Sequence, residues 1–143
     1  MSDLKRFIDA QADNYADALE EIKRGQKRSC WMWYVFPQIK GLGFSSMSKL
    51  YAIQSLQEAK EYLQDPILGS RLLEICEAAL NVESNIPEKV FGCPDNLKLQ
   101  SSMTLFEMAQ PENPIFGKIL EKYFDGQRDN RTIQIIMEME ENK

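Results

Sequence analysis

Residues 95–109 read DNLKLQSSMTLFEMA, a stretch whose apolar side chains recur at helical spacing. When each residue is turned by about 100° around a helix axis, one broad face collects the apolar side chains of Leu99, Met103, Leu105, Phe106 and Ala109. Such a face must be buried against other elements, so the stretch predicts a helix packed on a core. We expect the opposite face to be exposed to water, with Asn96, Gln100, Thr104 and Glu107.

Helix signals recur on both sides of this segment, whereas strand signals are weak. The sequence predicts an all-α fold, a compact single domain over residues 1–143 built from seven or eight short helices. The expected helical segments are Asp3–Arg24, Cys30–Phe36, Met47–Ile53, Ser55–Leu63, Asp65–Asn81, Pro94–Gln110, Asn113–Gly126 and a last one capped by Asp129 or Asn130. Between the fifth and the sixth, Asn85-Ile-Pro87 is expected to start one short turn that Gly92 closes.

Capping residues support several of these boundaries. Ser55 with Glu58 forms a capping box, and the pairs Asp65-Pro66 and Asn113-Pro114 are typical of helix starts. In the first segment, the apolar residues form one stripe: Leu4, Phe7, Ile8, Tyr15, Leu19 and Ile22. Gln11 is the one polar residue inside this stripe.

Composition excludes several functional classes. The chain has 17 basic and 22 acidic residues and a net charge of −5, which disfavours nonspecific binding of nucleic acid. The longest apolar run, Cys30–Phe36, is far too short to span a bilayer, and residues 1–6 do not resemble a signal peptide. Three cysteines without a repeated spacing predict reduced thiols and a cytoplasmic location.

The chain contains no histidine. This excludes histidine-dependent nucleophiles, histidine general bases and histidine-ligated metals, and we expect no metal site. Any catalysis would depend on carboxylates, lysine, tyrosine, cysteine or backbone groups. The sequence identifies neither a cofactor nor an oligomeric state.

The apolar face of residues 95–109 also carries chemistry. Asp95, Lys98 and Ser102 fall inside it, and Ser101 lies between two apolar flanks. Lys98 is within reach of Asp95 at i−3 and of Ser102 at i+4. Such groups cost several kcal/mol to bury unless they are paired. They predict either a polar pocket wall for an anionic or carbonyl group, with a Lys–Ser dyad as its catalytic version, or a structural network, which is the simpler interpretation.

The second candidate is the aromatic segment that follows Lys27 and Arg28. The segment could line a pocket for a flat ligand by stacking and cation–π interaction, or it could be core; the candidate residues are Trp31, Trp33, Tyr34, Phe36 and Gln38. The two tryptophan side chains point in different directions in either secondary structure, so we expect at most one of them to face a cleft.

The sequence contains three ordered blocks of motifs. The first contains Lys27-Arg-Ser, Trp31-Met-Trp-Tyr-Val-Phe-Pro-Gln38 and Gly41-Leu-Gly43. The second contains Tyr51-Ala-Ile, Glu58-Ala, Tyr62-Leu, Pro66, Leu68-Gly69 and Arg71-Leu72. The third contains Phe91-Gly92, Pro94-Asp95, Leu97-Lys98-Leu99 and Ser101-Ser-Met-Thr-Leu-Phe106. From about Phe7 to Ile136, the chain thereby resembles a bacterial family of small, all-helical proteins, domain of unknown function 1810, often labelled "calpastatin".

The resemblance implies a compact helical fold and carries over no established activity. Calpastatins are long, repetitive and disordered inhibitors, whereas this chain is aromatic and unrepeated, so the label predicts nothing here. Two positions depart from the family pattern: Cys30 stands where members usually have histidine, and Asn96 replaces a usual acid. If that histidine is catalytic in the family, this protein, which has Cys30 there, would be inactive or would depend on the thiol instead.

Three functional hypotheses follow. The first is a domain that binds a small anionic or nucleotide-like ligand through Lys98, Ser101, Ser102, Asp95, Trp33, Gln38, Lys27 and Arg28. The second is an enzyme that acts on a phosphorylated metabolite with Lys98 and a hydroxyl group. The third is a protein-interaction module with an exposed aromatic patch. The sequence does not decide whether the protein is an enzyme.

Overall fold

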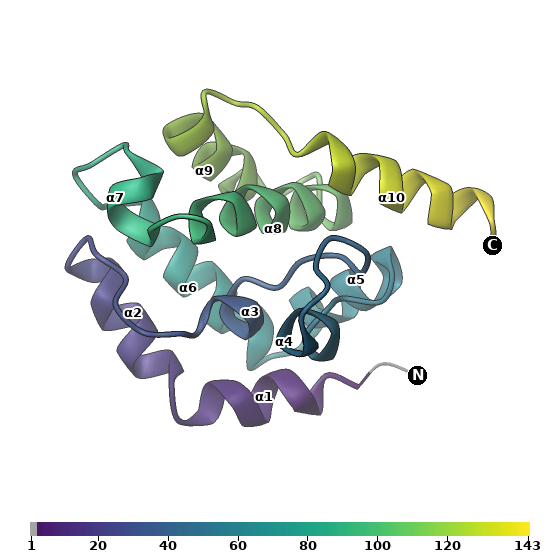
Figure 1. The fold of residues 1–143 in the computed structure, drawn as a ribbon, viewed down its shortest axis with the longest axis horizontal. Coiled ribbons are helices and arrows are strands. Elements are labelled where there is room, and N and C mark those ends of the chain that lie inside the picture. Colours follow the sequence, from purple (N-terminus) through teal and green to yellow (C-terminus); the bar gives the residue numbers. More distant parts are fainter. Residues whose placement is uncertain (1–2) are drawn as a thin grey trace.

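A computed structural model describes residues 3–143, in which helices follow one another along the chain, joined by turns and loops (Figure 1). The described part contains ten helices: α1 (Lys5–Ala12), α2 (Tyr15–Lys23), α3 (Met32–Val35), α4 (Ser46–Leu50), α5 (Leu56–Gln64), α6 (Leu68–Leu80), α7 (Pro87–Phe91), α8 (Asp95–Ala109), α9 (Ile115–Phe124) and α10 (Asn130–Glu141). None of these helices is long and apolar enough to cross a membrane. The predicted fold class is confirmed, although the helices outnumber the seven or eight expected.

The helix α8 is the centre of the packing. It contacts α5, α7, α9 and α10, and every side chain from Ser101 to Phe106 is buried. The predicted apolar face is therefore confirmed. The predicted wet face is wrong for Asn96 and Thr104, which are buried, because neighbouring helices surround α8 instead of covering one side of it.

The first predicted helix, Asp3–Arg24, is two helices that meet at Asp13 and Asn14. The two halves have different partners, since α1 packs on α3 whereas α2 packs on α6. Gln11, the polar residue in the apolar stripe, is buried near this break. Its amide donates hydrogen bonds to the Tyr34 carbonyl oxygen at 2.7 Å and to the Tyr62 hydroxyl at 2.9 Å. A single straight helix could not follow both packing surfaces.

The predicted caps are confirmed. The Ser55 hydroxyl accepts the Glu58 N–H at 3.1 Å, and the Asp65 carboxylate accepts two N–H groups at the start of α6. The Asn113 side chain accepts the Ile115 N–H, and Asp129 accepts the Thr132 N–H at the start of α10. These bonds satisfy backbone donors that a helix leaves free at its first turn.

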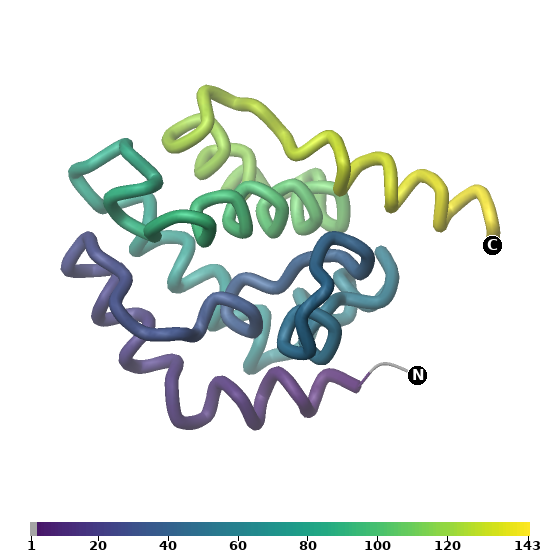
Figure 2. The backbone as a smooth tube through the Cα atoms, in the orientation of Figure 1, coloured from purple at the N-terminus to yellow at the C-terminus, as the bar shows by residue number. Residues whose placement is uncertain are grey.

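The chain between α3 and α5 folds back on itself (Figure 2). Ile39 and Ile53 form a parallel bridge, in which the Ile53 N–H donates to the Gln38 carbonyl at 2.8 Å and the Lys40 N–H donates to the Ile53 carbonyl at 2.9 Å. The helix predicted to reach Ile53 therefore ends at Leu50, because the backbone beyond it pairs with another segment. This pairing brings residues 38–44 beside residues 48–54.

Candidate functional site

The two tryptophans of the aromatic segment have different environments. Trp31 is buried in the core, and its indole N–H donates to the Glu21 carboxylate at 2.9 Å. Trp33, two residues further along the chain, is only partly buried and lines a cleft. The prediction that at most one tryptophan faces a cleft is confirmed, because α3 turns the two side chains apart.

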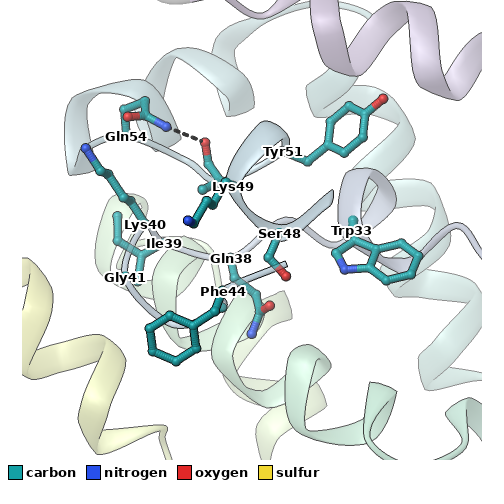
Figure 3. Close-up of a pocket in the computed structure, with 12 residues that line it drawn as sticks. Trp33, Gln38, Ile39, Lys40, Gly41, Phe44, Ser48, Lys49, Tyr51 and Gln54 are labelled. Atoms are coloured by element: carbon teal, nitrogen blue, oxygen red, sulfur yellow. Dashed lines mark hydrogen bonds between the residues drawn. The ribbon is translucent and has the colours of Figure 1, made fainter. Parts of the chain in front are cut away.

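The cleft has a volume of about 440 Å³ and opens between residues 38–44 and 48–54 (Figure 3). We call it the aromatic cleft, and its lining residues are Trp33, Gln38, Ile39, Lys40, Gly41, Gly43, Phe44, Ser48, Lys49, Tyr51, Ala52 and Gln54. The lining includes three aromatic residues, two lysines and two glutamines, but no carboxylate. Phe44 is 87% exposed, an unusual state for a phenylalanine in a folded domain.

Three polar side chains of the aromatic cleft lack partners among the described residues. Among residues 3–143, the ammonium groups of Lys40 and Lys49 make no hydrogen bond or ion pair, and the Gln38 side chain makes no hydrogen bond. Gln54 is held by its own loop, since its amide donates to the Ala52 carbonyl at 3.1 Å. The cleft therefore offers positive charge and hydrogen-bonding groups that the fold itself does not use.

Two glycines allow the loop to approach its neighbours. A Cβ atom on Gly43 would lie 2.5 Å from the Ser48 side chain, closer than real Cβ contacts. Gly41 has a φ of +105°, a backbone conformation that favours glycine, and a Cβ there would lie 3.4 Å from Ile135 of α10. Of these two glycines, only Gly41 has a positive φ, whereas Gly43 is required by its close approach to Ser48.

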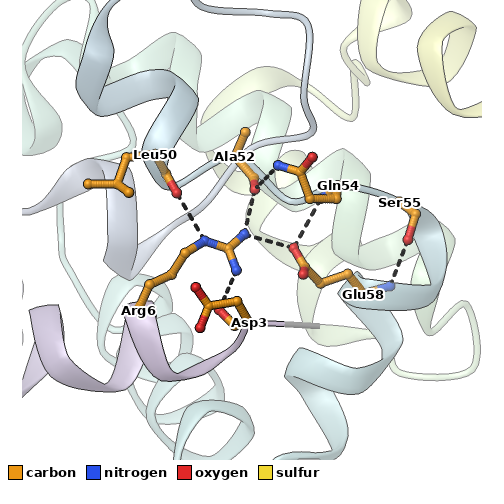
Figure 4. Close-up of polar contacts among 7 residues, drawn as sticks. All are labelled: Asp3, Arg6, Leu50, Ala52, Gln54, Ser55 and Glu58. Carbon is orange, nitrogen blue, oxygen red and sulfur yellow. Dashed lines mark hydrogen bonds and ion pairs between the residues drawn. The ribbon is translucent and has the colours of Figure 1, made fainter. Parts of the chain in front are cut away.

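A buried ion pair holds the wall of the cleft in place (Figure 4). The Arg6 guanidinium lies 2.9 Å from the Glu58 carboxylate, and the two side chains are 12% and 5% exposed. Arg6 also donates to the carbonyl oxygens of Leu50 at 2.9 Å and Ala52 at 2.7 Å, on either side of Tyr51. Glu58 accepts the Gln54 N–H at 3.0 Å, so α1 and α5 together fix residues 50–54.

Sequence reasoning missed this network. Arg6 and Glu58 are 52 residues apart, and no periodic pattern joins them. The capping box indicated Glu58 only as a partner of the cap residue Ser55. In the structure, the Glu58 carboxylate accepts the N–H of Gln54, one residue before Ser55.

Four predicted site residues come together beside the aromatic cleft. Asp95 pairs with Lys27 at 2.8 Å and with Lys98 at 3.2 Å, and the second of these is the predicted i, i+3 pair. The Lys98 ammonium lies 4.3 Å from the centre of the Trp33 ring, a cation–π contact. Among these four, only Trp33 lines the cleft, together with Gln38.

The other three predicted site residues lie elsewhere. The single proton of the Ser101 hydroxyl has two acceptors in reach, the Leu97 carbonyl at 3.1 Å and the Asp129 carboxylate at 3.0 Å, and the bond to Asp129 supports the start of α10. The Ser102 hydroxyl is fully buried and has no hydrogen-bond partner among the described residues. Arg28 is exposed, and its backbone N–H donates to Glu21.

Glu21 is a further residue that the sequence did not single out. Partial burial alone would raise the pKa of its carboxyl group, but four hydrogen bonds to its charged form lower the pKa to about 2. The donors are the N–H groups of Arg28 and Ser29, the Ser29 hydroxyl and the Trp31 indole. Glu21 thereby fixes the turn that leads into the aromatic segment.

Fold and site together define an all-α domain with an aromatic, basic cleft that contains no carboxylate. The chain belongs to the family described as "Protein of unknown function (DUF1810)", which it matches over residues 1–136. This confirms the resemblance noted in the three sequence blocks, and that description does not contain the label calpastatin.

The crystal structure of the conserved hypothetical protein Rv1873 from Mycobacterium tuberculosis is similar to this chain. The two are 47% identical and superpose with a TM-score of 0.92, over 94% of this chain and 96% of that chain. A search of curated proteins found no match. Neither the family nor the neighbour is described with an activity, so the function has to be argued from the site.

Proposed function

We propose that this protein binds a small anionic ligand with a flat ring in the aromatic cleft. The observation that carries the proposal is the pair of lysines, Lys40 and Lys49, whose ammonium groups have no partner among residues 3–143 in a cleft without carboxylates. Positive charge that lines a concave site, without negative charge beside it, raises the local concentration of anions. A volume of about 440 Å³ also lies within the range of about 300–1,000 Å³ that is usual for small-molecule sites.

The ring specificity of the proposal rests on the remaining lining. Trp33, Phe44 and Tyr51 offer aromatic faces, and a flat ring stacked on them would cover the exposed Phe44 side chain. The amides of Gln38 and Gln54 carry both donors and acceptors, which suit the polar edge of a heterocycle. This chemistry favours a nucleotide-like ligand over an aliphatic acid.

The charged cluster behind Trp33 has a positioning role in this proposal. Lys98 lies against the Trp33 ring and is in turn held by Asp95, which also pairs with Lys27. These residues would keep the ring oriented toward the ligand without contacting the ligand themselves. Direct roles for Ser101, Ser102 and Arg28 in ligand binding stay predictions.

A cytoplasmic location belongs to the same proposal. Cys30, Cys76 and Cys93 are all free thiols, and two of them are exposed. Free thiols are typical of reducing compartments. Phosphorylated ring compounds would be available to the protein there.

Thermal-shift measurements with AMP, GMP, UMP and FMN test the proposal, with adenosine and inorganic phosphate as half-ligand controls. At about 100 times its Kd, a ligand stabilises the fold by about 2.7 kcal/mol. This corresponds to a rise in Tm of roughly 5–10 °C for a domain of this size. We expect at least one ring phosphate to give such a shift, and each half-ligand to give a smaller one.

The matched variants are Lys49→Ala and Lys118→Ala. Both lysines are exposed, but Lys118 lies on α9 and does not line the aromatic cleft. Lys49→Ala should remove most of the ligand-induced shift, and Lys118→Ala should leave it unchanged. Equal shifts in the two variants, or no shift with any ring phosphate, would overturn the proposal.

A further inference from the structure

A second cleft continues from the aromatic cleft toward α10. It has a volume of about 570 Å³, and it shares Lys40, Gly41 and Gln54 with the aromatic cleft. Its other lining residues are Ser55, Arg131, Ile135, Glu138, Met139, Glu140, Asn142 and Lys143. The two clefts thus meet at the Lys40–Gly41 turn, and we call the second one the α10 cleft.

A glycine lies at the junction between the clefts. A Cβ atom on Gly41 would already lie 3.4 Å from the Ile135 side chain, so any larger side chain would approach α10 across the junction. Lys40 stands at the same place with its ammonium group unpaired among the described residues. A cation at the midpoint of a two-part cleft suits an anionic group at the midpoint of an extended ligand.

The chemistry of the α10 cleft differs from that of the aromatic cleft. Ile135 and Met139 form an apolar floor that packs on the core. Glu138 and Arg131 both line the same cleft; Arg131 donates to the Gln134 side chain at 3.2 Å, whereas Lys143 is paired with Glu140 at 3.0 Å. A wall that carries a carboxylate beside a guanidinium suits uncharged hydroxyl groups, which can donate to the first and accept from the second.

We infer that the ligand has two heads joined by a diphosphate group. In this inference, which rests on the proposed function, the ring occupies the aromatic cleft and the diphosphate lies at Lys40. The second head carries hydroxyl groups and lies over Ile135 and Met139, within reach of Glu138. The ligand class is therefore a nucleoside diphosphate esterified to a sugar or to a second nucleoside.

Isothermal titration calorimetry with matched ligand pairs tests this inference. The pairs are ADP with ADP-glucose and UDP with UDP-glucose, which differ in the second head and in one negative charge on the terminal phosphate, so a gain in affinity arises against the loss of that charge. In at least one pair, the two-headed ligand should bind about tenfold more tightly than the nucleoside diphosphate.

Variants of α10 show whether the gain arises in the α10 cleft. Met139→Ala should remove most of the gain and leave the affinity for the nucleoside diphosphate unchanged. Glu138→Gln should do the same with little effect on folding, because Glu138 is exposed. Met137→Ala is the control, since Met137 is 55% exposed on the same helix and does not line the α10 cleft.

The possible failures are distinguishable. If nucleoside diphosphates bind and the second head adds no affinity, this inference is overturned and the proposed function stands. The same holds if the gain survives both Met139→Ala and Glu138→Gln. If none of the ring phosphates binds, the proposed function fails and takes this inference with it.

Discussion

Replacing Arg6 with methionine removes the positive half of the buried ion pair behind the aromatic cleft. Methionine keeps much of the apolar volume of the arginine stem, so the main loss is polar. Glu58, which is 5% exposed, would retain the Gln54 N–H as a donor but would lose the guanidinium 2.9 Å away. The carbonyl groups of Leu50 and Ala52 would each lose the donor that Arg6 supplies.

The expected cost follows from this geometry. Removing one partner of a buried pair typically costs about 3–5 kcal/mol, because the remaining charge stays buried without compensation. For a domain of this size, that corresponds to a fall in Tm of roughly 10–20 °C. The exposed pair of Arg24 and Glu20, whose side chains are 72% and 57% exposed, provides the control. Arg24→Met should change the free energy of unfolding by less than about 0.5 kcal/mol.

Urea denaturation followed by circular dichroism measures both effects. Glu58→Leu and the double variant Arg6→Met, Glu58→Leu complete a double-mutant cycle. The double variant should be destabilised by less than the sum of the two single variants, since it leaves no buried charge unpaired. If Arg6→Met costs no more than Arg24→Met, or if the cycle is additive, the ion pair does not hold residues 50–54 in the way described.

Three further predictions concern local stability. Ser101→Ala should lower the free energy of unfolding, measured by urea denaturation, by about 1 kcal/mol because it removes the hydrogen bond to Asp129. Ser102→Ala should leave the stability unchanged or raise it, because it removes a buried hydroxyl with no partner among residues 3–143. A larger loss of stability in Ser102→Ala than in Ser101→Ala would refute this assignment. Gly69→Ala should destabilise by about 1–3 kcal/mol despite the better helix propensity of alanine, since its Cβ would lie 2.1 Å from the Leu63 carbonyl oxygen. Gly117→Ala is the control there, because its Cβ would meet the ends of two side chains, Glu107 at 2.9 Å and Arg128 at 3.6 Å, and no backbone atom of another described helix within 4 Å; equal effects in the two variants would contradict the packing. Hydrogen bonds lower the pKa of Glu21 from 4.5 to about 2, so the charged carboxylate stabilises the fold above about pH 4.5 and this contribution is lost as the pH falls toward 2. The stability difference between wild type and Glu21→Gln, measured by urea denaturation across this range, should shrink with falling pH, and a constant difference would count against the hydrogen-bonded role.

Much of the fold is predictable because its signals are local. The caps at Ser55, Asp65 and Asn113 depend on residues two or three positions away, and all three are confirmed. The apolar face of residues 95–109 depends on periodicity within one helix, and its five members are buried. The pair of Asp95 and Lys98 needs only the i, i+3 spacing of an α-helix.

The candidate site was only partly predictable. The sequence named Trp33, Gln38 and Lys98 as candidate site residues. In the structure, Trp33 and Gln38 line the aromatic cleft, and Lys98 contacts Trp33. Lys40 and Lys49 were missed, because single lysines in polar stretches carry no signal until the loop places them beside aromatic rings. Ser101 and Ser102 are adjacent in sequence, but only the position of Asp129 decides that one is paired and the other is not.

The sequence by itself determined the helical class, most helix boundaries and the family, since these follow from local spacing, capping and ordered motifs. Tertiary structure alone decided how many neighbours each helix has, and hence that Asn96 and Thr104 on α8 are buried. It also decided the pairing of Arg6 with Glu58 and of residues 38–40 with Ile53, which together form the cleft. The physical reason is that periodicity describes one helix at a time, whereas burial and long-range hydrogen bonds depend on which segments the folded chain brings together.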